Sequence, residues 1–303
     1  MIEANDLTKR YGDTTAVNAL TFTVRPGRVT GFLGPNGAGK TTTLRMLLGL
    51  NRPTSGTITI DGHPFRDLPR GLRRVGALLD AHDVHGGRTA RAHLAALARS
   101  NGIPRGRADE VLEEVGLAQV ARRRVGGFSL GMKQRLGIAT ALLGDPPVLL
   151  FDEPLNGLDV EGVLWVRALL RRLADEGRTV FVSSHQMSEM ENTADELIVV
   201  GRGELIAAES LTEFAARGTR LSVAVRTPDL AELTGVLTAE GASVQPAGPE
   251  LCAVTGLSAA RIGELAFAHR VLLHELSPRT ASLEEAFLEL TADSVEYLAG
   301  DAR

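Results

Sequence analysis

The stretch Gly34-Pro35-Asn36-Gly37-Ala38-Gly39-Lys40-Thr41-Thr42 decides the fold, because it is a complete Gly-x-x-x-x-Gly-Lys-Thr pattern. It follows an apolar run of strand length at 29–33 and precedes a segment with Leu44, Leu47 and Leu48 at helical spacing. In a strand-loop-helix unit of this kind, backbone N–H groups and the helix N-terminus converge on phosphate oxygens. The sequence therefore predicts a phosphate-binding loop inside an α/β fold.

Two side chains of this loop carry specific chemistry. Lys40 is expected to reach the β- and γ-phosphates of a nucleotide, and the hydroxyl of Thr41 can bind Mg2+. A glycine turn that precedes a helix by chance is the alternative. The candidate phosphate-binding residues are Gly34, Pro35, Asn36, Gly37, Ala38, Gly39, Lys40, Thr41 and Thr42.

A second pattern places two carboxylates at the end of an apolar strand, in Val148-Leu149-Leu150-Phe151-Asp152-Glu153-Pro154. Residues at the carboxyl end of a strand face the ligand crevice of an α/β sheet. Asp152 would hold Mg2+, directly or through water, and Glu153 is the candidate general base that deprotonates the attacking water. Without the phosphate loop, the same pair would more often form a capped turn.

A third pattern, Phe128-Ser129-Leu130-Gly131-Met132-Lys133-Gln134, lies between these two. Together the three resemble the nucleotide-binding subunit of ABC transporters, over at least 2–204. The resemblance implies that the nucleotide is ATP, and that Ser129 and Gly131 open a helix facing the γ-phosphate of ATP held by the other protomer. Leu130 and Met132 depart from the usual Gly and Gln. Without the resemblance, Ser129 is simply a good helix N-cap.

The resemblance also implies roles for three separate residues. Tyr11 matches the aromatic residue that stacks on adenine, Asp159 the acid of the loop where two protomers meet, and His185 the histidine that contacts the γ-phosphate and helps hold the attacking water. A half-buried tyrosine, a plain turn and a structural histidine are the respective alternatives.

One residue of the family pattern is replaced. Asp80 stands where the family commonly has a Gln that binds Mg2+ and senses the membrane subunit. Because a carboxylate can still bind a water of Mg2+, Asp80 joins Thr41 and Asp152 as a candidate metal residue.

Residues 1–216 are predicted to form one ATPase domain. The expected fold is that of an ABC-type P-loop NTPase, with a RecA-like core, an antiparallel β subdomain and a helical subdomain. Strands are expected around 19–25 and 56–61, helices through most of 88–144, and a buried parallel sheet from the apolar runs 148–151, 180–183 and 197–200.

Residues 217–303 are predicted to form a small α+β accessory domain of β-α-β-β-α-β order, which we interpret as the ferredoxin-like arrangement. The expected strands are 221–226, 243–245, 251–254 and 271–276, and the expected helices are 230–240 and 259–269. A last helix at 282–290 would begin with the capping box Ser282-Leu283-Glu284-Glu285.

Composition narrows the class of protein. The net charge of −4 over 303 residues gives no general basic field, so nucleic acid is not an expected partner. The longest stretches without Asp, Glu, Lys or Arg have 11 residues (14–24 and 29–39), whereas a membrane-spanning helix needs about 20 apolar residues. The single cysteine, Cys252, and the acidic start of the chain favour the cytoplasm.

Two functions are open within this family. One is a transport motor, and the other is an ABC ATPase acting on nucleic acid or ribosomes; a single cassette without sustained heptads favours transport. Residues 129–135 and 282–288 resemble bacterial ABC-2-type exporters, including those that give antibiotic resistance. The resemblance implies an ATP-driven homodimer, peripheral on the inner face of the cell membrane, with a separately encoded transmembrane permease. Because ATP would close the dimer by drawing Ser129 toward the partner's phosphate, we expect the permease to dock near 80–97, beside the helical segment that carries Ser129.

Overall fold

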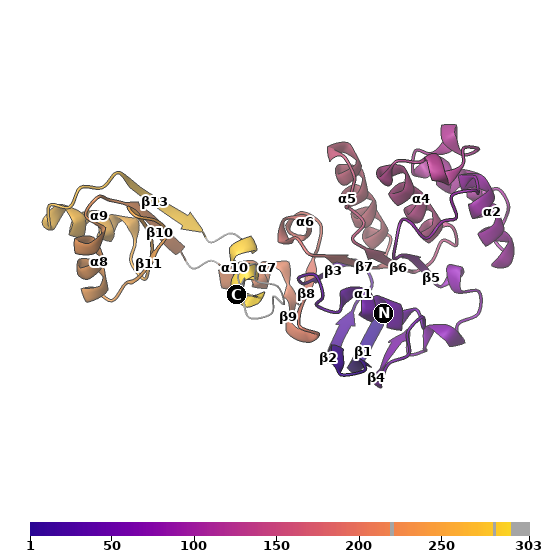
Figure 1. Ribbon diagram of the computed structural model, residues 1–303, viewed down its shortest axis with the longest axis horizontal. Helices are drawn as coiled ribbons and strands as arrows, with labels where there is room; N and C mark the ends of the chain where they lie inside the picture. Colours follow the sequence, from indigo (N-terminus) through magenta and orange to yellow (C-terminus); the bar gives the residue numbers. More distant parts are fainter. Residues whose placement is uncertain (219–220, 281–282, 292–303) are drawn as a thin grey trace. The chain divides into compact units, whose positions relative to one another are not determined.

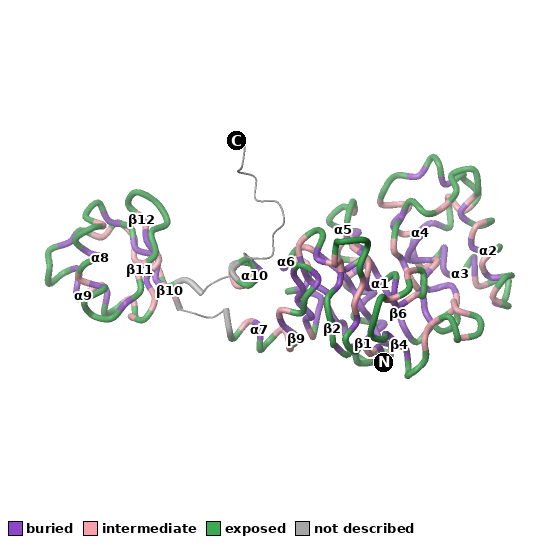
Figure 2. The backbone as a smooth tube through the Cα atoms, turned by 60° about the horizontal axis from the view of Figure 1, so that its bottom comes forward, coloured by how far each residue is buried: buried purple, intermediate pink, exposed green. Residues whose placement is uncertain are grey.

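The computed structural model describes residues 1–218, 221–280 and 283–291. Their Cα positions divide into two compact units (Figure 1). One holds Met1–Leu211 with Leu290 and Thr291, and the other holds Thr212–Glu289. In each unit buried residues gather inside and exposed ones outside (Figure 2).

A six-stranded sheet with the order β5-β6-β7-β3-β8-β9 forms the centre of the first unit. All neighbouring strands pair in parallel except the last, where β9 runs antiparallel to β8. Every residue of β6 and β7 is buried, which explains why their sequences are mostly apolar instead of alternating between apolar and polar residues. The predicted parallel sheet is confirmed. Its strands are β3 Arg28–Leu33, β5 Val75–Leu78, β6 Val148–Asp152, β7 Thr179–Ser184, β8 Glu196–Gly201 and β9 Glu204–Ser210.

An antiparallel sheet with the order β2-β1-β4 packs against this core. Its strands are β1 Ile2–Tyr11, β2 Thr14–Val24 and β4 Ser55–Ile60. The rings of Phe22, Phe32 and Phe181 join the two sheets, with centroids 5.1 to 5.9 Å apart. Such tilted and stacked aromatic contacts add specific packing to the area they bury, so the two sheets share one core.

Helices complete the first unit. The predicted helical region contains α2 Ala90–Ser100, α3 Arg107–Glu114 and α4 Leu130–Leu142, and α4 packs on β5. Around the central sheet lie α1 Lys40–Leu47, α5 Val160–Asp175 and α6 Met187–Glu191. Short 3-10 helices occupy Phe65–Asp67, Gly71–Arg73, Ala118–Val120 and Val125–Gly127. The structure thus has the predicted α/β core, antiparallel β subdomain and helical subdomain.

The second unit has the predicted β-α-β-β-α-β order. Its sheet is antiparallel throughout and ordered β11-β12-β10-β13, which is the ferredoxin-like arrangement. The elements are α7 Leu211–Gly218, β10 Leu221–Arg226, α8 Leu230–Ala239, β11 Ser243–Pro246, β12 Leu251–Thr255, α9 Ala259–Ala268, β13 Glu275–Thr280 and α10 Leu283–Thr291. A core of its own includes Val225, Leu237, Cys252, Val254 and Ile262. Ser282 of the expected capping box lies outside the described residues.

The predicted placement of the last strand was wrong, because β13 begins at Glu275 rather than at Val271. Val271 N–H donates to Ala266 O, and Arg270 N–H, from a residue with φ 57°, donates to Phe267 O. These are the two bonds of a Schellman motif, in which an apolar residue after the helix packs back on it. The buried Val271 therefore ends α9 instead of starting a strand.

Candidate active site

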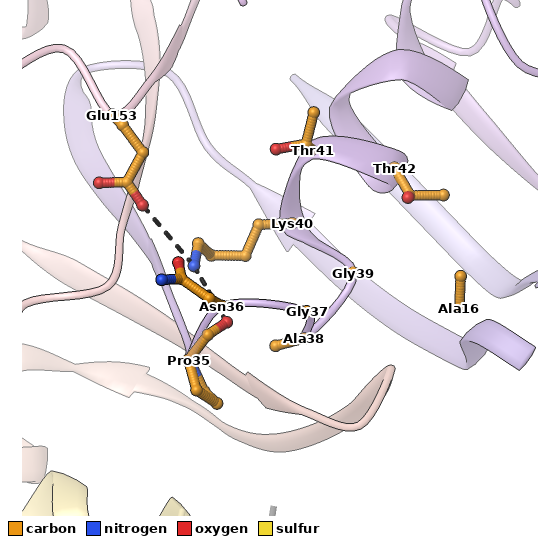
Figure 3. A pocket seen from close by; sticks show the side chains of 10 residues that line it. All are labelled: Ala16, Pro35, Asn36, Gly37, Ala38, Gly39, Lys40, Thr41, Thr42 and Glu153. Atoms are coloured by element: carbon orange, nitrogen blue, oxygen red, sulfur yellow. Dashed lines mark hydrogen bonds and ion pairs between the residues drawn. The ribbon is translucent and has the colours of Figure 1, made fainter. Parts of the chain in front are cut away.

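The phosphate loop joins β3 to α1 at the carboxyl edge of the parallel sheet. Gly39 precedes α1 with φ 95°, and a Cβ placed on it would lie 2.5 Å from Ala16 O. Only glycine fits this backbone conformation and this close approach. The loop surrounds a cavity of about 220 Å3 (Figure 3), lined by Ala16, Pro35, Asn36, Gly37, Ala38, Gly39, Lys40, Thr41, Thr42 and Glu153.

Lys40 crosses this cavity toward the end of β6 (Figure 3). Its ammonium donates to Gly34 O at 2.6 Å and Pro35 O at 3.3 Å, and lies 3.7 Å from Glu153 Oε1. The side chain is only 7% exposed, and this burial lowers the pKa of Lys40 from its ordinary value, while the carboxylates of Glu153 and Asp152 act in the opposite direction. A cation with so little water around it is well placed to exchange these carbonyls for phosphate oxygens.

Asp152 meets both the loop and the neighbouring strand. Thr41 Oγ1 donates to Asp152 Oδ2 at 2.7 Å, and Ser183 Oγ donates to Asp152 Oδ1. A hydroxyl and a carboxylate are hard oxygen donors of the kind that Mg2+ takes alongside water and phosphate oxygens. The donor set of Thr41 and Asp152 therefore fits Mg2+.

Glu153 follows with a left-handed backbone, at φ 48°, which is uncommon for a residue other than glycine. Hydrogen bonds hold its peptide groups on both sides. Its N–H donates to Ser183 Oγ at 3.1 Å, and its carbonyl accepts from Gln134 Nε2 at 2.9 Å and Asn156 N at 3.3 Å. A sparsely populated conformation persists where the surroundings fix it in this way, and it turns the carboxylate toward Lys40.

His185, which follows β7, reaches the same carboxylate. Its Nδ1 lies 2.9 Å from Glu153 Oε2, and its Nε2 lies 3.3 Å from Gln186 Nε2. Because the Gln186 amide nitrogen can only donate, Nδ1 is the ring nitrogen left to donate to Glu153. The Glu153 carboxylate thus lies between Lys40 and His185.

Tyr11 and Asp80 are not among the residues that line the cavity, and their contacts are with other residues. Tyr11 is 49% exposed, accepts a hydrogen bond from Asn51 Nδ2 at 2.7 Å, and has Lys9 Nζ 4.9 Å from its ring centroid. Asp80 Oδ1 accepts a hydrogen bond from the backbone N–H of His82 at 2.7 Å, and lies 3.0 Å from Nδ1 of the same histidine. The backbone bond is the main reason why the pKa of Asp80 is lowered.

Ser129, Gly131 and Asp159 do not line the cavity of their own chain. Ser129 Oγ accepts from Met132 N at 3.2 Å and caps α4, while Asp159 Oδ1 accepts from Gly162 N at 2.8 Å and caps α5. Both side chains therefore perform the local capping role that Ser and Asp have at helix starts.

Three polar residues at the site were missed from the sequence. Ser183 binds Asp152 and Glu153, Gln134 binds the Glu153 carbonyl, and Glu189 accepts the Ser184 hydroxyl at 2.5 Å. Burial raises the pKa of Glu189. The position of Ser183 at a strand end just before His185 could have indicated it, whereas the other two contacts depend on how helices pack.

Comparison with known proteins identifies the family. Residues 17–156 match the family described as ABC transporter, and residues 221–284 match a domain of unknown function. The bacitracin transport ATP-binding protein BcrA of Bacillus licheniformis is 48% identical over 209 residues, which are 68% of each chain. The chain belongs to the ABC transporter family.

Other similar proteins extend the match. The Nod factor export ATP-binding protein I of Burkholderia lata is 36% identical and covers 97% of this chain and 98% of its own. The dimeric cassette MJ0796 in a post-hydrolysis state with ADP and Pi has a TM-score of 0.64 at 26% identity, covering 70% of this chain and 99% of its own. A solved ATP-binding subunit of an ABC transporter has a TM-score of 0.66 at 27% identity, covering 72% and 92%.

This ABC protein is an ATPase, the ATP-binding and ATP-hydrolysing subunit of a transporter. None of the helices in the described part of the chain combines the length and the apolar character needed to cross a membrane.

Proposed function

We propose that this ABC ATPase drives an exporter, and that the cluster at the end of β6 hydrolyses its ATP. The export role is supported by relatives named for bacitracin transport, lantibiotic transport and Nod factor export. The same relatives disfavour the alternative of an ATPase acting on nucleic acid or ribosomes. The hydrolytic role rests on one observation, the convergence of Lys40, Asp152, Glu153 and His185 from three separate segments.

Each of these side chains has a distinct part in hydrolysis. Lys40 binds the β- and γ-phosphates in place of its own loop carbonyls. Glu153 orients the attacking water and takes its proton, and His185 contacts the γ-phosphate and keeps the Glu153 carboxylate in place through the 2.9 Å contact.

Thr41 and Asp152 would hold Mg2+, which supplies charge neutralisation on the phosphate oxygens when bound. Asp80 is proposed to act more distantly, through a water. Its exposed carboxyl leads us to expect a smaller effect of Asp80→Asn on ATP turnover than of Asp152→Asn. Equal effects of the two substitutions would contradict this order.

The ATP site is proposed to be completed by a second copy of the chain. Ser129 and Gly131 would present the start of α4 to ATP bound by the partner, and Asp159 would contribute where the protomers meet. Tyr11 is proposed to stack on the adenine after leaving its present contacts. This proposal is supported by two observations: these residues are not among those that line the cavity of their own chain, and the similar cassette MJ0796 is dimeric.

A separately encoded transmembrane permease is the proposed membrane partner, docking near residues 80–97 and holding the ATPase at the inner face of the membrane.

Residues 1–216 are proposed as the ATPase domain and 217–303 as an accessory domain without a role in phosphate binding. A chain cut after Gly218 should therefore keep its affinity for ATP. Loss of that affinity in a folded chain would disprove the division.

Glu153→Gln tests the proposed function directly, because it keeps the shape of the side chain and removes the base. The rate of ATP hydrolysis should fall roughly 100- to 10,000-fold, and an ATP-bound dimer should accumulate in light-scattering measurements. In vesicles that contain the membrane subunit, export should stop. Normal hydrolysis by this variant would remove the proposed role of Glu153.

A further inference from the structure

The carbonyl of Glu153 receives a hydrogen bond from a distant helix. Gln134 lies in the second turn of α4, its side chain is 4% exposed, and its Nε2 donates to Glu153 O at 2.9 Å. A buried amide of this kind has a strong requirement for its partner, because an unpaired polar group inside a protein costs about 1 to 3 kcal/mol. The described structure gives Gln134 no other hydrogen bond.

The position of Gln134 is fixed by the packing of its helix. α4 lies directly on β5, and a Cβ at Gly76 in that strand would collide with Ala141 O of the helix. Backbone against backbone leaves little room for α4 to shift along the sheet. The donor that reaches Glu153 is therefore held by the core rather than by a loop.

The bond matters because of the conformation that it holds. Glu153 has φ 48°, and the direction of its carboxylate depends on keeping its peptide groups in that orientation. Ser183 Oγ fixes the N–H side, whereas Gln134 and Asn156 N fix the carbonyl side. Without Gln134 only the longer 3.3 Å bond from Asn156 would remain on the carbonyl.

We propose that Gln134 is a positioning residue for ATP hydrolysis, holding the peptide of Glu153 so that its carboxylate stays between Lys40 and His185. Gln134 lies in the same helix whose first turn contains Ser129 and Gly131. This packed helix therefore connects the residues proposed to meet the partner's ATP with the residue that holds the peptide of Glu153. The proposal rests on the proposed role of Glu153 as base.

The test uses the full-length protein with Gln134→Met, which keeps the length of the side chain and removes the donor. Glu153 should remain present but poorly oriented, so kcat should fall about tenfold with KM for ATP changed less than about threefold. Gln134→Glu, which is isosteric and lacks the donor, gives the same comparison if Gln134→Met fails to fold. Gln119→Met, the same substitution at an exposed glutamine in the 3-10 helix Ala118–Val120, is the matched control and should leave both constants unchanged.

A second measurement separates positioning from general destabilisation. In single-turnover hydrolysis, Gln134→Met added to Glu153→Gln should cause no further loss, because residues acting through one group are not additive. A kcat within twofold of wild type in both folded Gln134 variants would overturn the proposal, as would a tenfold loss that persists on the Glu153→Gln background. If Glu153→Gln hydrolyses ATP normally, both the role of Glu153 as base and the positioning role of Gln134 are contradicted. If the Gln134 variants hydrolyse ATP normally but Glu153→Gln does not, only the positioning role is contradicted.

Discussion

The end of β6 and the start of α4 are two polar regions of the same unit with opposite organisation. At β6, Asp152 and Glu153 already bind side chains from the phosphate loop, β7 and α4. At α4, the Ser129 hydroxyl accepts a hydrogen bond from the N–H of Met132, in the first turn of its own helix. The first region is assembled within one chain, whereas the second would, in the proposed composite site, present N–H groups of a helix start to another molecule.

Because of this difference, substitutions in the two regions should impair ATP hydrolysis in different ways. A change at β6 or its loop should damage the site of the chain that carries it. A change at the start of α4 should damage the site of the partner, while the chain that carries it still binds ATP. This contrast can be tested with variants that separate binding from turnover.

Lys40→Ala and Gly131→Asp should give the largest effects, and these effects should separate ATP binding from ATP turnover. Removing Lys40 should cost ATP binding and turnover, on the order of a hundredfold or more, since a preorganised cation at a phosphate is lost. Gly131→Asp should abolish turnover yet keep the affinity for ATP. A Cβ at Gly131 lies 3.4 Å from its nearest neighbour, Gly157 O, which is an ordinary van der Waals contact.

A mixture of Lys40→Ala and Gly131→Asp tests whether each ATP site is built from two chains. Half of the dimers formed at random contain one copy of each variant, and each such dimer has one site that lacks both changes. Hydrolysis should therefore return to about a quarter of the wild-type rate. Lys40→Ala mixed with Asp152→Asn is the control, because both changes lie on the same side of the site. Rescue in the control mixture, or none in the first, would contradict the composite arrangement.

Ser129→Asp should have a smaller effect that decides between the two roles of this residue. Aspartate caps a helix as well as serine does and interacts favourably with the helix dipole, so the melting temperature should not fall. Its charge would repel the γ-phosphate of the partner's ATP, and turnover should drop about a hundredfold. Unchanged turnover with unchanged melting temperature would show that Ser129 is only a cap.

The two regions also differ in how far the sequence predicted them. The loop 34–42, Asp152 and Glu153 were predicted because they lie at the carboxyl ends of strands of the parallel sheet, and such strand ends meet at one edge. His185 was predicted from the resemblance to the ABC family. The cap at Ser129 was likewise visible as a local pattern. The contact of Gln134 with Glu153 was not, because it depends on how closely α4 packs on β5, and residue spacing carries no information about that.

The C-terminal unit shows the same boundary between local and tertiary information. Its order of strands and helices followed from the pattern of apolar residues and was predicted. The start of β13 was misplaced, because the apolar run at Val271 looks the same whether it begins a strand or closes a Schellman motif. Which of the two forms depends on the φ of Arg270, at 57°, and that angle is set in the folded unit.

The smallest expected effect concerns Glu189, which belongs to the assembled region at β6 and β7 and faces Glu153, His185 and Arg167. Burial, aided by the charge of Glu153, raises the pKa of Glu189 above its ordinary 4.5, although the Ser184 hydroxyl acts the other way. The folded state therefore binds this proton more tightly than the unfolded state. The stabilisation is complete below pH 4.5 and is lost as pH rises through the folded-state pKa.

Glu189→Gln cannot ionise but still accepts the Ser184 hydroxyl. Its melting temperature, relative to wild type, should therefore rise as pH increases from 4.5 toward neutrality. Glu191→Gln, an exposed acid at the end of the same helix, should show a constant difference over this range. A constant difference for Glu189→Gln as well would mean that the assembled region carries no cost of buried charge at this residue. The first turn of α4 contains no acidic residue. The two regions would then differ in their hydrogen bonding and not in the cost of a buried charge.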